Sequence, residues 1–213
     1  RKLKVIGVTG TDGKTTTVYL IYHLLKSAGY KTSMVSSIGA TINDEAYETG
    51  FHVTTPSSFS LQKFLKQARK QGSEYFVLEV TSHALDQNRI WGIPFKVGVI
   101  TNVTPEHLDY NKSYEDYLKT KRKLLVKAET AIVNKDDVSY AYLSDLRRIK
   151  SKKNWITYSL SRDLEFDLKS NSFSSQFNKY NALAAISLCK FFKVGKIDIK
   201  NGLEAFNLPP GRL

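Results

Sequence analysis

The sequence predicts an α/β protein with a mostly parallel sheet that is flanked by helices. Strand-like apolar runs alternate with helix-like stretches along the 213 residues, the pattern of a sheet with crossover helices. The runs 76–78 and 97–100 are continuously apolar, as expected of strands buried on both faces. A glycine-rich turn joins the first strand to the first helix. The length suits one domain or two.

Apolar and β-branched residues predict six strands. They are Lys4–Thr9, Thr32–Ser37, Tyr75–Val80, Val97–Asn102, Thr130–Asn134 and Trp155–Tyr158. In a parallel sheet the carboxyl ends of such strands share one edge, where ligands bind. Polar residues follow several of these ends, so we expect the functional site at that edge.

Apolar residues at helical spacing predict six helices. They are Lys14–Ala28, Ser57–Gln71, Ser113–Val126, Val138–Ile149, Asn178–Phe192 and Ile197–Phe206. Ser113 is expected to cap its helix, with Asp116 at the third helical position. The polar, Ser-rich segment Ser159–Gln176 predicts a short hairpin or a flexible excursion, and a hairpin would add a small antiparallel part to the fold.

The net charge of +12 is spread over most polar segments, which favours a solvated basic surface. Only Lys119–Lys127 and Arg147–Lys153 approach the clustering of a nucleic-acid surface, and anionic substrates explain the bias equally well. We therefore expect no nucleic-acid partner. The single cysteine, Cys189, lies in an apolar segment and is expected in the core, which excludes an internal disulfide and a cysteine metal cluster.

No stretch reaches the roughly 18 apolar residues of a membrane span, so no membrane partner is expected. The chain starts almost directly on a strand without a signal peptide, which predicts a cytoplasmic protein. Both ends look cut, and the sequence does not predict an oligomeric state.

The segment Gly10–Thr17 is the strongest functional signal in the chain. It reads Gly-Thr-Asp-Gly-Lys-Thr-Thr-Thr between a strand and a helix, where backbone N–H groups and the helix N-terminus can bind phosphate. Lys14 would reach the terminal phosphates and the Thr15 hydroxyl would ligate Mg²⁺. The strict P-loop spacing is not met, because Val8 stands at the position of its first glycine. A turn that only closes a strand–helix joint is the alternative.

Two further clusters follow buried strands. Glu79 ends an apolar strand and is placed either to bind Mg²⁺ or to remain a surface carboxylate. Arg89, two residues after Gln87, can hold an anionic substrate or form a surface ion pair. His107 is a candidate metal ligand or phosphate contact, although a lone histidine is more often structural. Spacing alone assigns Lys121 to a solvated basic helix face.

Taken in order, these motifs resemble the Mur ligase family. They are Gly10–Thr17, Thr54-Thr55-Pro56, Glu79–Arg89 (Glu-Val-Thr-Ser-His-Ala-Leu-Asp-Gln-Asn-Arg), Glu106-His107-Leu108-Asp109-Tyr110, Lys121–Leu125, Asn178–Ala185 and Pro210-Gly211-Arg212. They resemble the central ATP-binding domain of the family, closest to its UDP-N-acetylmuramoyl-tripeptide synthetase (MurE) type. The resemblance covers residues 1–213 and implies that a UDP-binding domain and a C-terminal amino-acid-binding domain are absent from this chain.

The resemblance implies an ATP-dependent ligase that forms a C–N bond in peptidoglycan synthesis, and so acts in cell wall biogenesis, cell shape and cell division. The γ-phosphate of ATP would pass to the D-glutamate carboxylate of UDP-MurNAc-L-Ala-D-Glu. The amine of a free amino acid would attack that acyl phosphate. The present chain alone is expected to bind nucleotide but to be inactive. The sequence does not predict which amino acid the ligase adds.

The resemblance also implies a role for each matching position. Implied ATP contacts are Gly10, Thr11, Asp12, Gly13, Lys14, Thr15, Thr16, Asn178, Asn181 and Arg212. Implied Mg²⁺ ligands are Thr15, Glu79, His107 and Lys121, the last as a CO₂-derived carbamate. Implied catalytic residues are Lys14, His107 and Lys121. Implied contacts to the muramoyl dipeptide are Thr54, Thr55, Thr81, Gln87 and Arg89.

Three positions depart from the family pattern. Asp12 replaces an expected asparagine and places an extra carboxylate near the phosphates; Val53 replaces asparagine, and Thr81 replaces serine. Two alternatives stay open. One is a sister ligase on the same scaffold, such as a folylpolyglutamate synthase, a cyanophycin-type enzyme or an amidating relative. The other is a non-catalytic nucleotide-binding module.

Overall fold

The computed structural model describes residues 2–47, 55–104, 113–149, 154–163, 165–168 and 170–211, without the side chains of 146–149 and 163. One sheet of strand order β4-β3-β2-β5-β1-β6-β7-β8 crosses the molecule. The strands are β1 (Lys4–Thr9), β2 (Thr32–Val35), β3 (Ala40–Ile42), β4 (Glu45–Tyr47), β5 (Tyr75–Glu79), β6 (Phe95–Ile100), β7 (Thr130–Asn134) and β8 (Asn154–Tyr158). The six strands β2-β5-β1-β6-β7-β8, in sheet order, pair in parallel.

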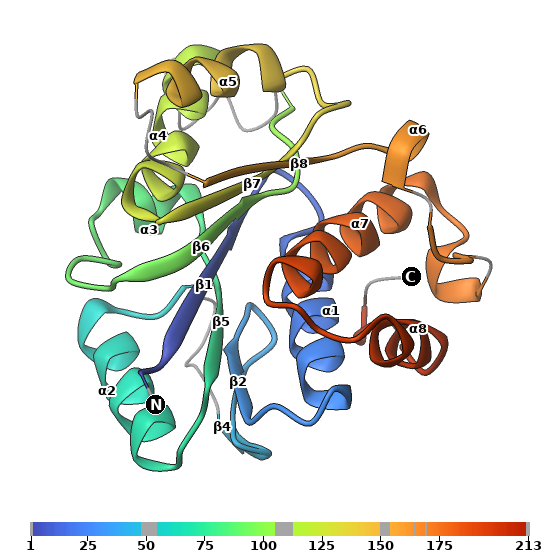
Figure 1. Cartoon of the computed structure of the whole chain (residues 1–213). Coiled ribbons are helices and arrows are strands. Elements are labelled where there is room, and N and C mark those ends of the chain that lie inside the picture. The colour runs from blue at the N-terminus through green and yellow to red at the C-terminus, as the bar shows by residue number, and fades with distance from the viewer. Residues whose placement is uncertain are drawn as a thin grey trace.

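Helices cover both faces of this sheet (Figure 1). On one face lie α1 (Lys14–Ser27), α7 (Gln176–Phe191) and α8 (Lys196–Glu204). Because side chains of a strand alternate between faces, Ile6 and Val8 of β1 enter the core under α1 and α7. Val5 enters the core on the other face. The sheet is therefore buried on both sides, as its apolar runs predict.

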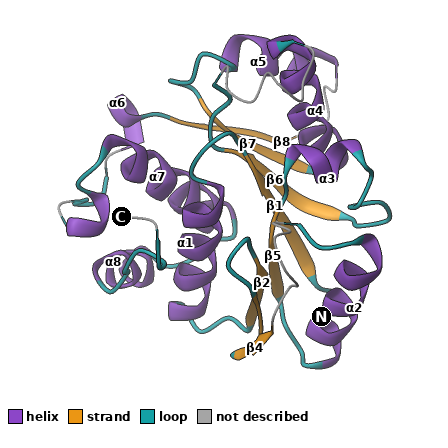
Figure 2. Ribbon diagram, turned by 180° about the vertical axis from the view of Figure 1, so that it is seen from behind, coloured by secondary structure: helices purple, strands orange, loops and turns teal. Residues whose placement is uncertain are grey.

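The opposite face carries α2 (Ser58–Lys70), α3 (Ser82–Asp86), α4 (Tyr114–Lys127) and α5 (Tyr140–Ile149), seen from behind in Figure 2. Leu124 of α4 packs in the core with Phe76 and Leu78 of β5. Leu125, its neighbour, joins a third cluster with α5 and β7. Ser113 caps α4 as expected, its Oγ accepting from the Asp116 N–H at 3.2 Å.

The arrangement of three strands determines where the site forms. The first strand, β1, lies between β5 and β6 in parallel register. The loop after β1, the end of β5 and the segment after β6 therefore meet at one edge of the sheet. Polar residues that are about 65 and 90 positions apart in sequence come within hydrogen-bond distance there.

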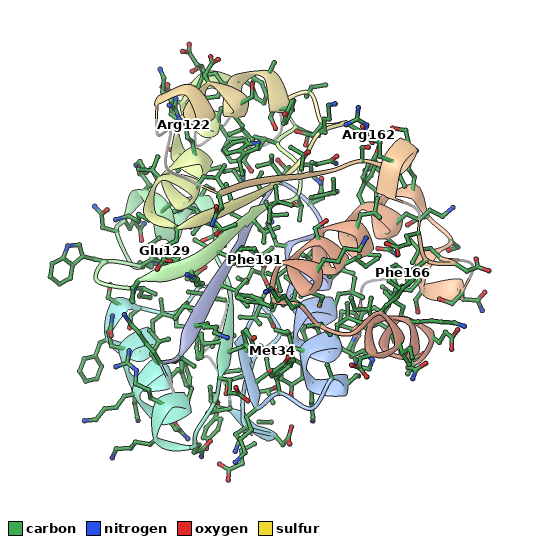
Figure 3. The ribbon with its side chains drawn as sticks, in the orientation of Figure 1. Met34, Arg122, Glu129, Arg162, Phe166 and Phe191 are labelled. Carbon is green, nitrogen blue, oxygen red and sulfur yellow. The ribbon has the colours of Figure 1, made fainter. Side chains whose placement is uncertain are left out.

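The α/β class and the small antiparallel part are confirmed, but the hairpin predicted at Ser159–Gln176 is wrong for the described residues. That segment instead forms the short helices α6 (Leu160–Asp163) and η1 (Asn171–Phe173). Phe166, labelled in Figure 3, is buried beside the ammonium groups of Lys190 and Lys196 on α7 and α8. Apolar anchors therefore hold this polar segment against the two helices.

The antiparallel part is the hairpin of β3 and β4, paired to the edge strand β2. Its turn residues Asn43 and Asp44 both have positive φ, 48° and 78°, a conformation that these two residue types tolerate. Cys189 is buried in the core, as expected. Within the described part of the chain, no helix is both long and apolar enough to cross a membrane.

Candidate functional site at the carboxyl edge of the sheet

The glycine loop between β1 and α1 is held against the segment that follows β6. The N–H of Thr11 donates to the Asn102 backbone oxygen at 3.0 Å, and the N–H of Asp12 donates to Asn102 Oδ1 at 2.9 Å. Thr101 Oγ1 donates to the Asp12 backbone oxygen at 2.6 Å. A Cβ at Gly10 would lie 1.8 Å from Thr101 Oγ1, so only glycine allows this contact.

The loop ends at Gly13, the N-cap of α1, whose φ of 74° lies in the left-handed region. The helix that follows begins with Lys14, Thr15 and Thr16. The N–H groups of its first turn and the positive end of its dipole therefore face the loop. The Lys14 ammonium donates to the Thr11 backbone oxygen at 2.6 Å and lies across the loop. This geometry is suited to binding an anion.

Glu79 at the end of β5 is a buried carboxylate, 1% exposed, so it is not a surface carboxylate. Thr15 Oγ1 donates to both of its oxygens, at 3.2 and 3.0 Å. The N–H of Ser37, after β2, donates to Glu79 Oε2 at 2.9 Å, and the Ser37 hydroxyl lies 3.0 Å from Thr15 Oγ1. The end of β5, the segment after β2 and the first turn of α1 thus meet at one carboxylate. Our sequence reasoning missed Ser37, although the polar pair Ser36-Ser37 directly follows an apolar strand.

This donor set fits Mg²⁺. A hydroxyl and a single carboxylate beside an anion-binding loop are hard oxygen ligands, and Mg²⁺ is commonly held by one or two carboxylates plus substrate phosphates. No group of three or more His, Cys, Asp or Glu side chains is placed for metal binding among the residues that the structure describes. A site of this composition therefore depends on phosphate oxygens to complete the coordination of the ion.

Lys121 of α4 is 1% exposed, and its ammonium donates to the Gly10 backbone oxygen at 2.6 Å. It also lies 4.3 Å from the ring centre of Tyr117. The expectation of a solvated helix face is wrong for this residue, because α4 points it at the glycine loop. Burial holds the pKa of Lys121 well below the ordinary lysine value, and the charge of Lys14 lowers it further, whereas Asp12 opposes the shift.

A second group of candidate residues forms a connected set beside Glu79. Thr55 Oγ1 donates to the Glu79 backbone oxygen at 3.1 Å and lies 3.2 Å from Thr81 Oγ1, which caps α3. Arg89 Nη1 donates to the Thr55 backbone oxygen at 2.8 Å, and its Nε donates to Gln87 Oε1 at 2.9 Å. These two bonds orient the guanidinium, leaving further donors for a carboxylate or phosphate.

The two asparagines of α7 adjoin the other side of the glycine loop. Asn181 is buried; its Oδ1 accepts from Thr17 Oγ1 at 3.2 Å, and its Nδ2 donates to Asn178 Oδ1 at 3.3 Å. A cavity of about 110 Å³ opens there. Its lining is Asp12, Gly13, Thr101, Asn102, Thr104, Asn134, Asp136, Asp137, Phe177, Tyr180 and Asn181.

The structure thus places four predicted residues around the glycine loop and the start of α1 (Gly10–Thr16): Glu79, Lys121, Asn178 and Asn181. Beside them lie the predicted substrate contacts Thr55, Thr81, Gln87 and Arg89. Three predicted residues, Thr54, His107 and Arg212, lie outside the described residues, as does Val53.

The fold and this edge define the chain as a parallel α/β domain with a glycine-rich loop between its first strand and first helix. The family model of the Mur ligase middle domain matches residues 8–206. The chain belongs to the Mur ligase family.

Two curated relatives illustrate the kinship. The UDP-N-acetylmuramoyl-L-alanyl-D-glutamate–2,6-diaminopimelate ligase 1 of Clostridium acetobutylicum is 35% identical over 99% of this chain and 47% of its own length. The UDP-N-acetylmuramyl-tripeptide synthetase of Deinococcus radiodurans is 34% identical over 100% of this chain and 47% of its own length. The chain spans about half the length of the curated relatives it matches.

Solved structures agree with this assignment. A structure of a UDP-N-acetylmuramoyl-L-alanyl-D-glutamate–2,6-diaminopimelate ligase superposes with a TM-score of 0.84 at 25% identity, covering 100% of this chain and 48% of that one. The Escherichia coli FolC structure, in complex with DHPP and ADP, has a TM-score of 0.68 at 17% identity over 97% of this chain and 57% of its own. At that identity it shows a shared fold alone.

We expect Thr15→Val to lower the free energy of unfolding by about 1–3 kcal/mol. The substitution keeps the shape but removes a donor to a buried carboxylate, which then lacks part of its hydrogen bonding. Urea denaturation measures the change. Thr15→Ser, which keeps the hydroxyl, should lose less than about 1 kcal/mol, from one methyl group. Equal losses in the two variants would contradict the role of this hydrogen bond.

We expect the free energy of unfolding of the wild type, measured relative to that of Lys121→Met, to rise with pH. Between the lowered folded pKa and about 10.4, the unfolded chain binds a proton at Lys121 that the folded chain lacks. Wild-type stability therefore gains up to about 1.4 kcal/mol per pH unit from this residue, and the variant gains none.

Urea denaturation from pH 7 to 9.5 in CO₂-free buffer measures this slope. Lys123→Met serves as the control, because Lys123 lies on the same helix as Lys121 but is exposed and paired with Asp86 of α3. Its difference from the wild type should stay nearly flat. A flat difference for Lys121→Met as well would mean that burial does not shift the titration of Lys121.

Proposed function

We propose that the full-length protein is an ATP-dependent ligase that adds an amino acid to UDP-MurNAc-L-Ala-D-Glu in peptidoglycan synthesis. One observation carries the proposal: Lys14, Thr15, Glu79 and Lys121 surround a single glycine loop in a chain related to ligases of that dipeptide. The reaction would proceed through an acyl phosphate. Because ATP and a nucleotide-linked substrate are consumed, we place the protein in the cytoplasm.

The nucleotide is assigned to the glycine loop. The N–H groups of Gly13, Lys14 and Thr15 at the start of α1 and the Lys14 ammonium would hold the β- and γ-phosphates. Asn178 and Asn181, beside the cavity next to the loop, would meet the adenine. Arg212, outside the described residues, is assigned to the nucleotide from the family resemblance.

Thr15 and Glu79 would hold one Mg²⁺, and His107 and a carbamate on Lys121 a second. When bound, the ions neutralise charge on the phosphates and on the developing acyl phosphate. The carbamate would form when the neutral Lys121 amine adds to CO₂ and releases a proton. The lowered pKa of Lys121 supports this step, because a larger fraction of the amine is unprotonated than in an ordinary lysine.

The muramoyl dipeptide is assigned to Thr54, Thr55, Thr81, Gln87 and Arg89. Arg89, oriented by Thr55 and Gln87, would bind an anionic group of this substrate. One oxygen of the D-glutamate carboxylate would attack the γ-phosphorus, and ADP would leave. The amine would then attack the acyl carbon, lose a proton and expel phosphate. Positioning of the two anions by neighbouring strand ends supplies the catalysis in this proposal.

We propose that this chain binds nucleotide but does not turn over alone, and that the full-length protein carries further domains that bind the uridine end and the amino acid. Phosphate release by that protein, with ATP and Mg²⁺ and across a panel of amino acids, tests the function. Release should require both the muramoyl dipeptide and one amino acid. Phosphate release at the same rate without the muramoyl dipeptide would favour a sister ligase.

We expect Lys14→Ala to weaken MgATP binding by at least a hundredfold, because the loop loses its positive charge at the terminal phosphates. Isothermal titration calorimetry with the full-length protein measures the affinity. Lys63→Ala removes an equal charge from the exposed face of α2 and should bind as the wild type does. Unchanged affinity in Lys14→Ala would remove the glycine loop from the nucleotide site.

We expect Lys121→Ala to reduce ligase activity of the full-length protein by at least a hundredfold, with partial recovery when a short carboxylic acid is added. The acid can occupy the space of the side chain and supply the anionic oxygens that the carbamate would have presented. The control Lys123→Ala, two residues along the same helix, should have wild-type ligase activity that does not change when the acid is added. Full activity in Lys121→Ala would show that no carbamate acts there.

A further inference from the structure

Asp12 is a carboxylate at a fixed point of the glycine loop. Its backbone N–H and oxygen are held by Asn102 and Thr101, at 2.9 and 2.6 Å, and Asn102 Nδ2 makes a second contact to the oxygen at 3.4 Å. Gly10 on one side has no room for a Cβ, and Gly13 on the other occupies the left-handed region. The Cα of Asp12 therefore cannot move away from the loop without breaking these contacts.

The surroundings of Asp12 on the cavity side carry negative charge. Among the described residues that line the cavity, the carboxylates are Asp12, Asp136 and Asp137, and no lysine or arginine is present. Neutral donors satisfy the other two. Asp136 Oδ2 accepts from the Leu160 N–H and the Tyr180 hydroxyl, and Asp137 Oδ1 accepts from the Val103 and Ser139 N–H groups.

The cationic side of the loop only balances the carboxylates next to it. The ammonium groups of Lys14 and Lys121 both donate to loop carbonyls, from Thr11 and Gly10. Asp12 is close enough to Lys121 to act on its charge. Among the described residues next to the loop, these two lysines are offset by Asp12 and Glu79, and conversion of Lys121 to a carbamate would leave this group net negative. From the described side chains at the loop, a metal-free triphosphate would meet little net positive charge.

We propose that Asp12 makes nucleotide binding conditional on a divalent cation, so that the loop accepts the Mg²⁺ complex of ATP and rejects the metal-free triphosphate. This inference rests on the proposed function. Bound Mg²⁺ removes two negative charges from the ligand, so repulsion by the Asp12 carboxylate falls where the phosphates enter. Asp12 acts as a selectivity residue and needs no contact with the ion.

The test compares affinities of the full-length protein for ATP with excess Mg²⁺ and with EDTA, by isothermal titration calorimetry. Asp12→Asn removes the charge and keeps the size and the loop backbone contacts. The ratio of the two dissociation constants should fall about tenfold or more in the variant, because metal-free ATP binds more tightly. Affinity for MgATP should change less than affinity for metal-free ATP, since charge on the bound complex is already partly neutralised.

Asp44→Asn is the matched control. Asp44 is an exposed carboxylate in the β3–β4 turn, paired with Lys26, and asparagine tolerates its positive φ. This variant should keep the wild-type ratio. An unchanged ratio in Asp12→Asn would overturn the inference. So would a large loss of MgATP affinity, because Asp12 would then be a ligand of the metal. A wild type that binds ATP in neither condition would instead refute the proposed nucleotide site itself.

Discussion

The buried carboxylate of Glu79 is the constraint on which the edge of this sheet depends. An ionised carboxylate away from water is stable only when donors surround it. Thr15 after β1 and Ser37 after β2 supply those donors, so three separate stretches of chain converge on one group. The hydroxyl and N–H groups that satisfy Glu79 also keep its oxygens beside the glycine loop. The same contact therefore serves stability and the proposed metal site.

The sheet makes this convergence possible because β1 lies between β5 and β6 and its faces are covered by helices. Packing of α1 and α7 on one face and α4 on the other leaves the strand ends as the open polar edge. From α4, Lys121 reaches back under the loop to Gly10. Its burial is unfavourable for an ammonium, and such strain is typical of functional sites, which are often less stable than they could be.

Much of the fold could be predicted from sequence, because apolar periodicity reports burial directly. All six predicted strands and all six predicted helices are present, with ends shifted by a few residues at most. The β3–β4 hairpin was not predicted, because strands of three residues are too short to show an alternating apolar pattern. The turn pair Asn43-Asp44 was the available signal. The segment after Ser159 was misjudged because three apolar anchors, Phe166, Leu168 and Phe173, were outweighed by its serines.

The site could be predicted only in part. Glycine, lysine and threonine in the loop have local roles that sequence spacing reveals. By contrast, the burial of Lys121 depends on where α4 lies relative to β1, more than 100 positions away. Apolar spacing within one helix does not predict the position of that helix in the fold. Family resemblance supplied the assignment that spacing missed. The hydrogen bonds of Ser37 and Asn102 likewise arise from strand order, which no local pattern encodes.

The transfer of an oxygen atom tests the central claim most directly. The D-glutamate carboxylate of UDP-MurNAc-L-Ala-D-Glu would be labelled with ¹⁸O and incubated with the full-length protein, ATP, Mg²⁺ and the accepted amino acid. Activation as an acyl phosphate predicts that the released inorganic phosphate carries one ¹⁸O atom from the carboxylate, detected by mass spectrometry. Release of unlabelled phosphate during amide formation would contradict carboxylate activation at this loop.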